Sequence, residues 1–130
     1  MEIEQLVRET LEGVTHYPAY LEEPPAPRPE RYYLTARLGR SEENHISRAR
    51  LALQSYAPSL AGAMALNREA YGVMKDLLLG DPAVSRVSLV SDYDFTDTAT
   101  KRYRWQAIYE ITYYDDVLVG RGLAPAVQDN

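Results

Sequence analysis

The chain has 130 residues and contains no cysteine. This absence excludes disulfide bonds, thiolate zinc sites and thiol catalysis. No apolar run approaches the roughly 18 residues that a membrane-spanning helix requires, so we expect no membrane segment. The first residues, Met1 to Glu4, are acidic and lack the basic and apolar regions of a signal peptide. The sequence therefore predicts a soluble protein of the cytoplasm.

Positive charge is outweighed by negative charge, with 14 Lys and Arg against 19 Asp and Glu and a net charge of −5. Strong whole-surface binding to DNA is disfavoured, because that binding depends on Lys and Arg side chains. Catalytic fingerprints are also lacking, since no phosphate loop, dinucleotide motif or nucleophile elbow occurs. The two histidines, His16 and His45, lie in different expected elements, which does not favour a zinc site. We expect one non-enzymatic domain without a cofactor.

The hydrophobic pattern predicts a helix, several strands, a longer helix and further strands. Apolar stripes mark the helices, and the longer one begins after Pro58 and ends at Gly80-Asp81-Pro82. This order predicts an α+β fold, in which an antiparallel sheet carries two helices on one face. The domain is expected over residues 1–114, followed by a C-terminal arm over 115–130. The expected helices are 2–12 and 60–79, and the expected strands are 15–21, 32–38, 47–57, 84–93 and 103–113.

The strand 103–113 shows the clearest alternation in the chain. Tyr103, Trp105 and Tyr109 fall on one side together with Ala107 and Ile111. Because successive side chains of a strand point to opposite faces, this side is predicted to lie in the core, with Trp105 buried.

Two features lie outside the regular pattern. Residues 22–30, EEPPAPRPE, hold four prolines in nine positions and are expected to form an extended loop. This loop is either a stiff connector or a ligand for an aromatic groove or a neighbouring subunit.

Tyrosine occurs 11 times against one Phe and one Trp. Tyr suits surfaces where one end is buried and the other is wet, so the composition indicates an assembly protein.

The stretch between the last two strands carries the candidate polar sites. Asp92, Asp94 and Asp97 can supply oxygen ligands to a hard cation, although their spacing is not that of an EF-hand. A solvated turn explains them equally well. The nearby Lys101 and Arg102, with Arg104, Tyr103 and Trp105, have the composition of a nucleic-acid patch. Strand alternation instead sends the aromatic residues to the core and the basic residues to a rim or interface.

Two stretches resemble a known family. They are SEENHISRARLALQSYAPSLAGAMALNREAYGVMKDL, Ser41 to Leu77, and SDYDFTDTATKRYRWQAIYEITYY, Ser91 to Tyr114. Both resemble the tail terminator or tail completion proteins of long-tailed siphophages. The matching features are Asn44 and Ile46, then Leu53-Gln54-Ser55-Tyr56-Ala57 with Ser59, then Thr96 to Lys101 with Tyr103-Arg104 and Gln106-Ala107.

This resemblance implies a structural subunit without catalytic residues. In the family, six copies close into a ring that caps the tail tube, stops its polymerisation and joins it to the neck proteins. Genomic DNA passes through the lumen without sequence-specific binding. The expected place is the virion tail or neck, after assembly in the cytoplasm of the host bacterium. Another neck component, such as a head completion or stopper protein, is the alternative, and a small metal-binding domain using the three aspartates is a further one.

Two segments are the candidate interfaces of such a subunit. The polar tip between the last two strands is expected to dock a partner or face the lumen. The tail 115–130 has a composition that predicts a floppy segment unless a surface orders it. We expect it to be an interaction arm, the alternative being an edge strand of its own subunit. The candidate interface residues are Thr96, Asp97, Thr98, Thr100, Lys101 and Arg102 in the tip, and Val117, Leu118, Val119 and Leu123 in the arm.

Overall fold

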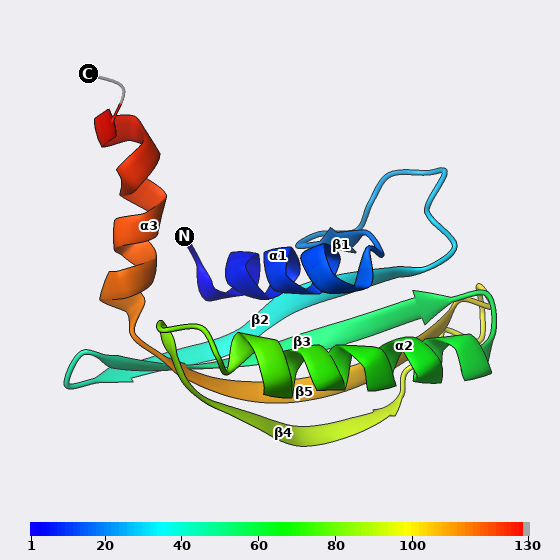
Figure 1. The fold of residues 1–130 in the computed structure, drawn as a ribbon. Coiled ribbons are helices and arrows are strands. Elements are labelled where there is room, and N and C mark those ends of the chain that lie inside the picture. The colour runs from blue at the N-terminus through cyan, green and yellow to red at the C-terminus, as the bar shows by residue number, and fades with distance from the viewer. Residues whose placement is uncertain (129–130) are drawn as a thin grey trace.

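The computed structural model describes the backbone of residues 1–128 and the side chains of residues 1–121. This part of the chain forms three α-helices and a five-stranded mixed sheet (Figure 1). The expected α+β single domain is confirmed. The elements are α1 (Ile3–Thr15), β1 (Ala19–Tyr20), β2 (Tyr32–Glu43), β3 (Ile46–Ala57), α2 (Leu60–Val73) with a π-helical turn η1 (Met74–Leu78), β4 (Val84–Asp94), β5 (Tyr103–Tyr113) and α3 (Asp115–Gln128).

The strands lie in the order β1-β2-β3-β5-β4. The four long strands pair antiparallel as expected, whereas the two-residue β1 runs parallel to β2, which makes the sheet mixed. The expected strand 15–21 is also too long. Helix α1 continues to Thr15 and ends where His16 adopts a left-handed conformation with φ 64°, which leaves only Ala19 and Tyr20 to pair.

The hydrophobic core lies between the helices and one face of the sheet. Helices α1 and α2 contribute to the same buried cluster as the inner faces of β3 and β5 (Figure 1). The opposite side of the sheet, called the open face here, carries Arg48, Arg50 and Gln54 of β3. Buried core residues include Ile3, Leu6, Val7 and Leu11 of α1, Ala63, Leu66 and Ala70 of α2, and Ala49, Leu51, Leu53, Ala107, Tyr109 and Ile111 of the sheet.

The start of β5 differs from the expected core assignment. Ala107, Tyr109 and Ile111 are buried as predicted, but Tyr103 is 37% exposed and Trp105 is only partly buried. Alternation identifies the face of a strand, but it does not show how far the covering helix layer extends over that face. Trp105 therefore forms part of a surface groove rather than of the closed core.

The C-terminal segment is not the floppy arm that its composition suggested. Residues Asp115 to Gln128 form helix α3, which extends away from the end of the sheet (Figure 1). Asp115 and Asp116 lie in its first turn, where negative charge interacts favourably with the helix dipole. The backbone therefore passes directly from β5 into a helix after Tyr114.

Candidate assembly surfaces

The tip between β4 and β5 is a closed turn. Asp97 and Arg102 exchange two backbone hydrogen bonds of 3.2 Å, so the exposed Thr98, Thr100 and Lys101 form the projecting tip. The Asp97 carboxylate accepts a bond of 3.0 Å from the backbone of Ala99. A hydrogen bond from the Thr100 side chain lowers the pKa of Asp97. The carboxylate thus shapes the turn.

The other two aspartates have separate roles. Asp94 accepts bonds from the backbone N–H and the hydroxyl of Thr96, at 2.9 and 2.6 Å, and the hydroxyl bond lowers the pKa of Asp94. Asp92 accepts a bond of 3.0 Å from the indole of Trp105. Within the described residues, no three Asp, Glu or His side chains gather as ligands for a metal ion. The geometry therefore gives the metal hypothesis no support.

Arg102 does not point outward from the tip. Its guanidinium donates to Glu23 at 2.6 Å, hydrogen-bonds Tyr32, and lies 4.9 Å from the centre of the Tyr56 ring. Burial has the largest single effect and would lower the pKa of Arg102, but the bond to Glu23 and the charge interactions with Glu23, Tyr32 and Tyr56 together raise that pKa. Tyr32 and Tyr56 stack with ring centres 4.4 Å apart. Arg102 therefore ties the proline-rich loop and the tip to the open face.

A chain of side-chain hydrogen bonds crosses the open face. Tyr56 donates to Gln54 at 2.8 Å, Gln54 donates to Gln106 at 2.8 Å, and Gln106 donates to Tyr93 at 2.5 Å. These residues come from β3, β5 and β4, and Gln54 and Gln106 are direct cross-strand partners. The sequence analysis missed this ladder. Two Gln residues on the same face of β3 and β5 could have indicated the ladder. Recognising them as partners requires the register between the two strands, which the sequence does not give.

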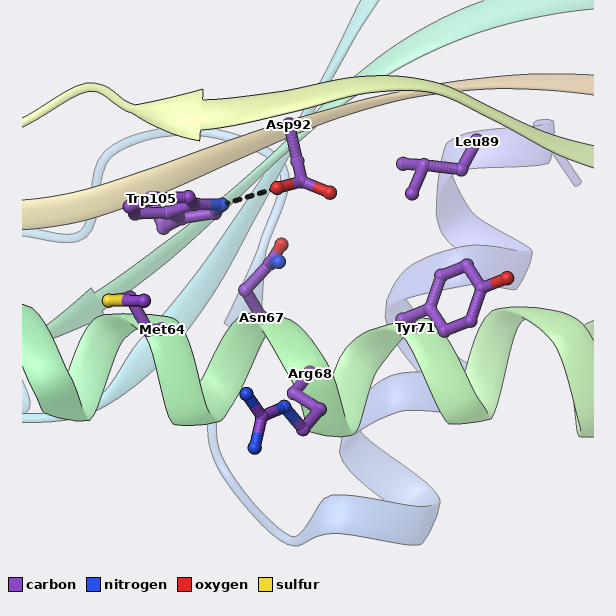
Figure 2. A pocket seen from close by; sticks show the side chains of 7 residues that line it. All are labelled: Met64, Asn67, Arg68, Tyr71, Leu89, Asp92 and Trp105. Carbon is purple, nitrogen blue, oxygen red and sulfur yellow. Dashed lines mark hydrogen bonds between the residues drawn. The ribbon is translucent and has the colours of Figure 1, made fainter.

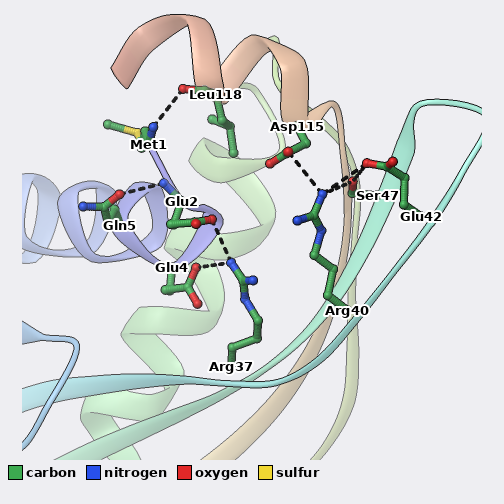
Figure 3. A network of polar contacts seen from close by, with 10 residues as sticks. All are labelled: Met1, Glu2, Glu4, Gln5, Arg37, Arg40, Glu42, Ser47, Asp115 and Leu118. Carbon is green, nitrogen blue, oxygen red and sulfur yellow. Dashed lines mark hydrogen bonds and ion pairs between the residues drawn. The ribbon is translucent and has the colours of Figure 1, made fainter. Parts of the chain in front are cut away.

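The first turns of α3 are fastened to the domain (Figure 3). The N-terminal amine of Met1 donates to the Leu118 carbonyl at 3.0 Å, and Asp115 pairs with Arg40 at 3.1 Å. Arg121 forms two bonds with Asp81, at 2.8 and 3.1 Å, which lower the pKa of that carboxyl. These contacts attach α3 to the N-terminus, to β2 and to the turn before β4.

The arm residues therefore divide into two groups. Leu118 is fully buried in the core of its own chain, which removes its side chain from any free surface. Val117 and Val119 are 38% and 47% exposed and remain available to a partner. The side chain of Leu123, the fourth residue proposed in this arm, lies outside the described residues.

An arginine network joins α1 to the same end of the sheet. Arg37 pairs with Glu4 at 2.6 Å and with Glu2 at 3.0 Å, and the bond to Glu4 raises the pKa of Arg37 (Figure 3). Arg40 reaches Glu42 and the hydroxyl of Ser47, each at 3.1 Å. These pairs fix the root of the β2–β3 hairpin, whose tip projects beyond the helices (Figure 1).

A groove runs between α2 and the strands β4 and β5 (Figure 2). It has a volume of about 290 Å³ and combines apolar, aromatic and polar walls. Met64 and Tyr71 on its helix side are 42% and 41% exposed. The carbonyl oxygen of the Asn67 side chain is buried without a hydrogen-bond partner among the described residues. We call this the α2 groove, lined by Met64, Asn67, Arg68, Tyr71, Leu89, Asp92 and Trp105.

Comparison with known proteins adds no relative, since no family model and no curated protein matches the chain. Among the residues whose structure is described, none of the helices combines the length and apolar character needed to cross a bilayer. The functional argument therefore depends on the surfaces described above and on the sequence resemblance.

Proposed function

We propose that this chain is the tail terminator of a long-tailed phage. Six copies form a ring on the finished tail tube, which stops addition of further tube subunits and joins the tube to the neck. The resemblance in Ser41 to Leu77 and Ser91 to Tyr114 supports this proposal. Those stretches form the tip of the β2–β3 hairpin, β3, α2 with most of η1, part of β4, and β5. They thus include the central strands of the sheet.

The observation that carries the proposal is the uncovered edge of β4. This strand of 11 residues is at the end of the sheet, and no other strand in the described part of the chain pairs with its outer side. Val90, Tyr93 and Phe95 are 46%, 40% and 38% exposed on or directly after it. Long exposed edges with apolar residues favour pairing with another chain. Pairing with a strand of a neighbouring subunit would cover this edge.

The places of the other unpartnered surfaces support ring closure. Val117 and Val119 of α3 lie at the opposite end of β5 from the β4–β5 tip (Figure 1). Different surfaces that meet between successive copies make a heterologous contact, which closes into a ring when the rotation allows it. The net charge of −5 disfavours tight binding to phosphates and suits a lumen through which DNA slides.

Tube growth in vitro tests the function. Tube protein that polymerises from a tail-tip complex should stop elongating when this chain is added, and the neck protein should then bind to the capped end. The expected result is a tube length that falls as more of the chain is supplied early. Tubes of unchanged length at saturating amounts of this chain would contradict the proposal.

A further inference from the structure

The α2 groove and the proline-rich loop are two features that the proposed function has not used. We propose that the loop of one copy, residues 22–30, binds in the α2 groove of the next copy. For its role in a ring this inference rests on the proposed function, and it names one of the contacts that hold the ring together. The contact itself forms between copies of this chain and needs no tube or neck protein.

The walls of the groove suit a proline-rich segment. Trp105 and Tyr71 provide aromatic surface, and Met64 provides a flexible apolar one (Figure 2). Proline rings pack well against aromatic side chains, and a segment already restricted by proline loses little conformational freedom on docking. A volume of about 290 Å³ accommodates a few residues of extended chain rather than a folded element.

The loop is presented in a form that a groove can receive. Its base is fixed, because Pro24 is buried and Glu23 bonds both Tyr32 and Arg102 at 2.8 and 2.6 Å. Its middle residues, 25–28, are exposed to solvent. The loop projects beside β2 beyond the layer formed by α1 (Figure 1). A fixed base and an exposed middle reduce the entropy lost on binding.

Unpaired polar groups in the groove match those of the loop. Among the described residues, the exposed Asp92 carboxylate accepts a side-chain hydrogen bond from the Trp105 indole alone. Arg28 carries the opposite charge and is a donor that suits Asp92. On the helix side, Arg68 forms no ion pair within the described structure. It complements Glu30, whose side chain is 80% exposed and makes only a long pair of 3.8 Å with Arg31 among the described residues.

Release of Arg28 from its own chain leaves no carboxylate unpaired. Arg28 pairs with Glu23 at 3.0 Å, in an exposed ion pair of the kind that contributes little to stability. Glu23 keeps its bonds to Arg102 and Tyr32 when Arg28 leaves. The guanidinium is therefore free to transfer to a second copy at small cost.

The two faces of the sheet explain why the partner is another copy. The loop bonds Tyr32 and Arg102 on the open face, whereas the groove lies beside α2 on the other face. The loop of one chain therefore does not fill its own groove. Each copy offers one loop and one groove, so the contact is head-to-tail and repeats around a ring. Ring closure strengthens such a small contact, because the last contact, which closes the ring, is intramolecular.

Cysteine crosslinking tests the contact, since the chain has no natural cysteine. Ala26→Cys in the loop and Met64→Cys in the groove, mixed as separate proteins, should form a disulfide-linked dimer on mild oxidation. The yield should exceed that of either variant alone. It should also exceed that of Ala26→Cys mixed with Glu43→Cys, a control at the exposed hairpin tip. A yield no higher than the control mixture would overturn the inference.

Charge reversal provides a second measurement, by sedimentation velocity with melting curves to confirm folding. Arg28→Glu and Asp92→Arg should each weaken self-association about tenfold or more, and the double variant should recover most of the loss. Arg48→Glu, an equal charge change on the open face of the internal strand β3, should leave it unchanged. Unaltered association of Arg28→Glu, or no recovery in the double variant, would overturn the contact while leaving the proposed function intact. If the wild-type chain self-associates but does not arrest tube growth, the proposed function is contradicted and the proposed contact stands.

Discussion

Glu23 is the residue on which three parts of the chain converge. Its carboxylate bonds Tyr32 and Arg102 and pairs with Arg28. Burial alone would raise the pKa of Glu23, but the bonds from Arg102 and Tyr32 outweigh it and lower that pKa below the ordinary 4.5. A carboxyl whose pKa is lower in the folded state stabilises the fold above its unfolded pKa and loses this effect as the pH falls.

The Glu23→Gln variant should therefore be less stable than wild type at pH 7, by about 1 kcal/mol or less, because solvent partly screens the pair. The difference should shrink as the pH falls below the ordinary 4.5 of a glutamate and the wild-type carboxylate takes up a proton. Denaturant unfolding of both proteins between pH 7 and pH 3 measures it. A difference that grows toward acid would show that the carboxylate does not stabilise the folded chain.

Individual side chains were the hardest feature to predict from the sequence. Composition and alternation correctly placed Tyr109 and Ile111 in the core, because a strand's period determines its faces. They could not show that Arg102 folds back onto Tyr32, since 70 residues separate the two in the chain. The aspartates were recognised as candidate turn residues, but the bond from the Trp105 indole to Asp92 depends on the register between β4 and β5.

At the scale of elements, helix α3 is the main departure from expectation. Its sequence shows only a weak hydrophobic pattern. Contacts with distant parts of the chain, including Met1, Arg40 and Asp81, hold its first turns in place. Tertiary contacts of this kind override weak local propensity. The long helix and the long strands were predicted well, because each presents a continuous apolar stripe to one core.

Leu118→Ala should lower the free energy of unfolding by about 2–5 kcal/mol, because a fully buried leucine is replaced by a cavity. Val119→Ala is the matched control, and it should change stability by no more than about 0.5 kcal/mol, since its side chain is 47% exposed. Chemical denaturation of the two variants compares them. Equal stabilities would mean that α3 is not docked on its own domain, as expected for an arm that binds a partner.

The β4–β5 tip should matter more for assembly than for folding. Replacing residues 98–101 by Asn-Gly keeps the Asp97–Arg102 pairing and shortens a loop, a change that alters closure entropy only slowly. The melting temperature should stay within a few degrees of wild type, while binding to tail tubes or neck protein falls. Melting curves and co-sedimentation with tubes provide the two readouts. A shortened protein that still caps tubes normally would exclude the tip from the interface.

At the scale of the whole molecule, the account describes a small domain with several unpartnered surfaces. The edge of β4, the exposed side of α3 and the α2 groove point in different directions, which favours an assembly of many copies over a single symmetric pair. The sequence indicated assembly through its many tyrosines. Tyr32, Tyr33 and Tyr56 are buried within the subunit, whereas Tyr71 and Tyr93 are 41% and 40% exposed in the α2 groove and on β4. Only some of the tyrosines therefore belong to the proposed surfaces.

Electron microscopy of the purified chain mixed with tail tubes assembled without a terminator tests the central claim most directly. The account predicts rings of six copies in the free protein at high concentration, and one ring at a single end of each tube. Class averages of tube ends with and without the chain provide the comparison. A chain that remains monomeric at the highest concentration, together with tube ends that show no added density, would contradict the account.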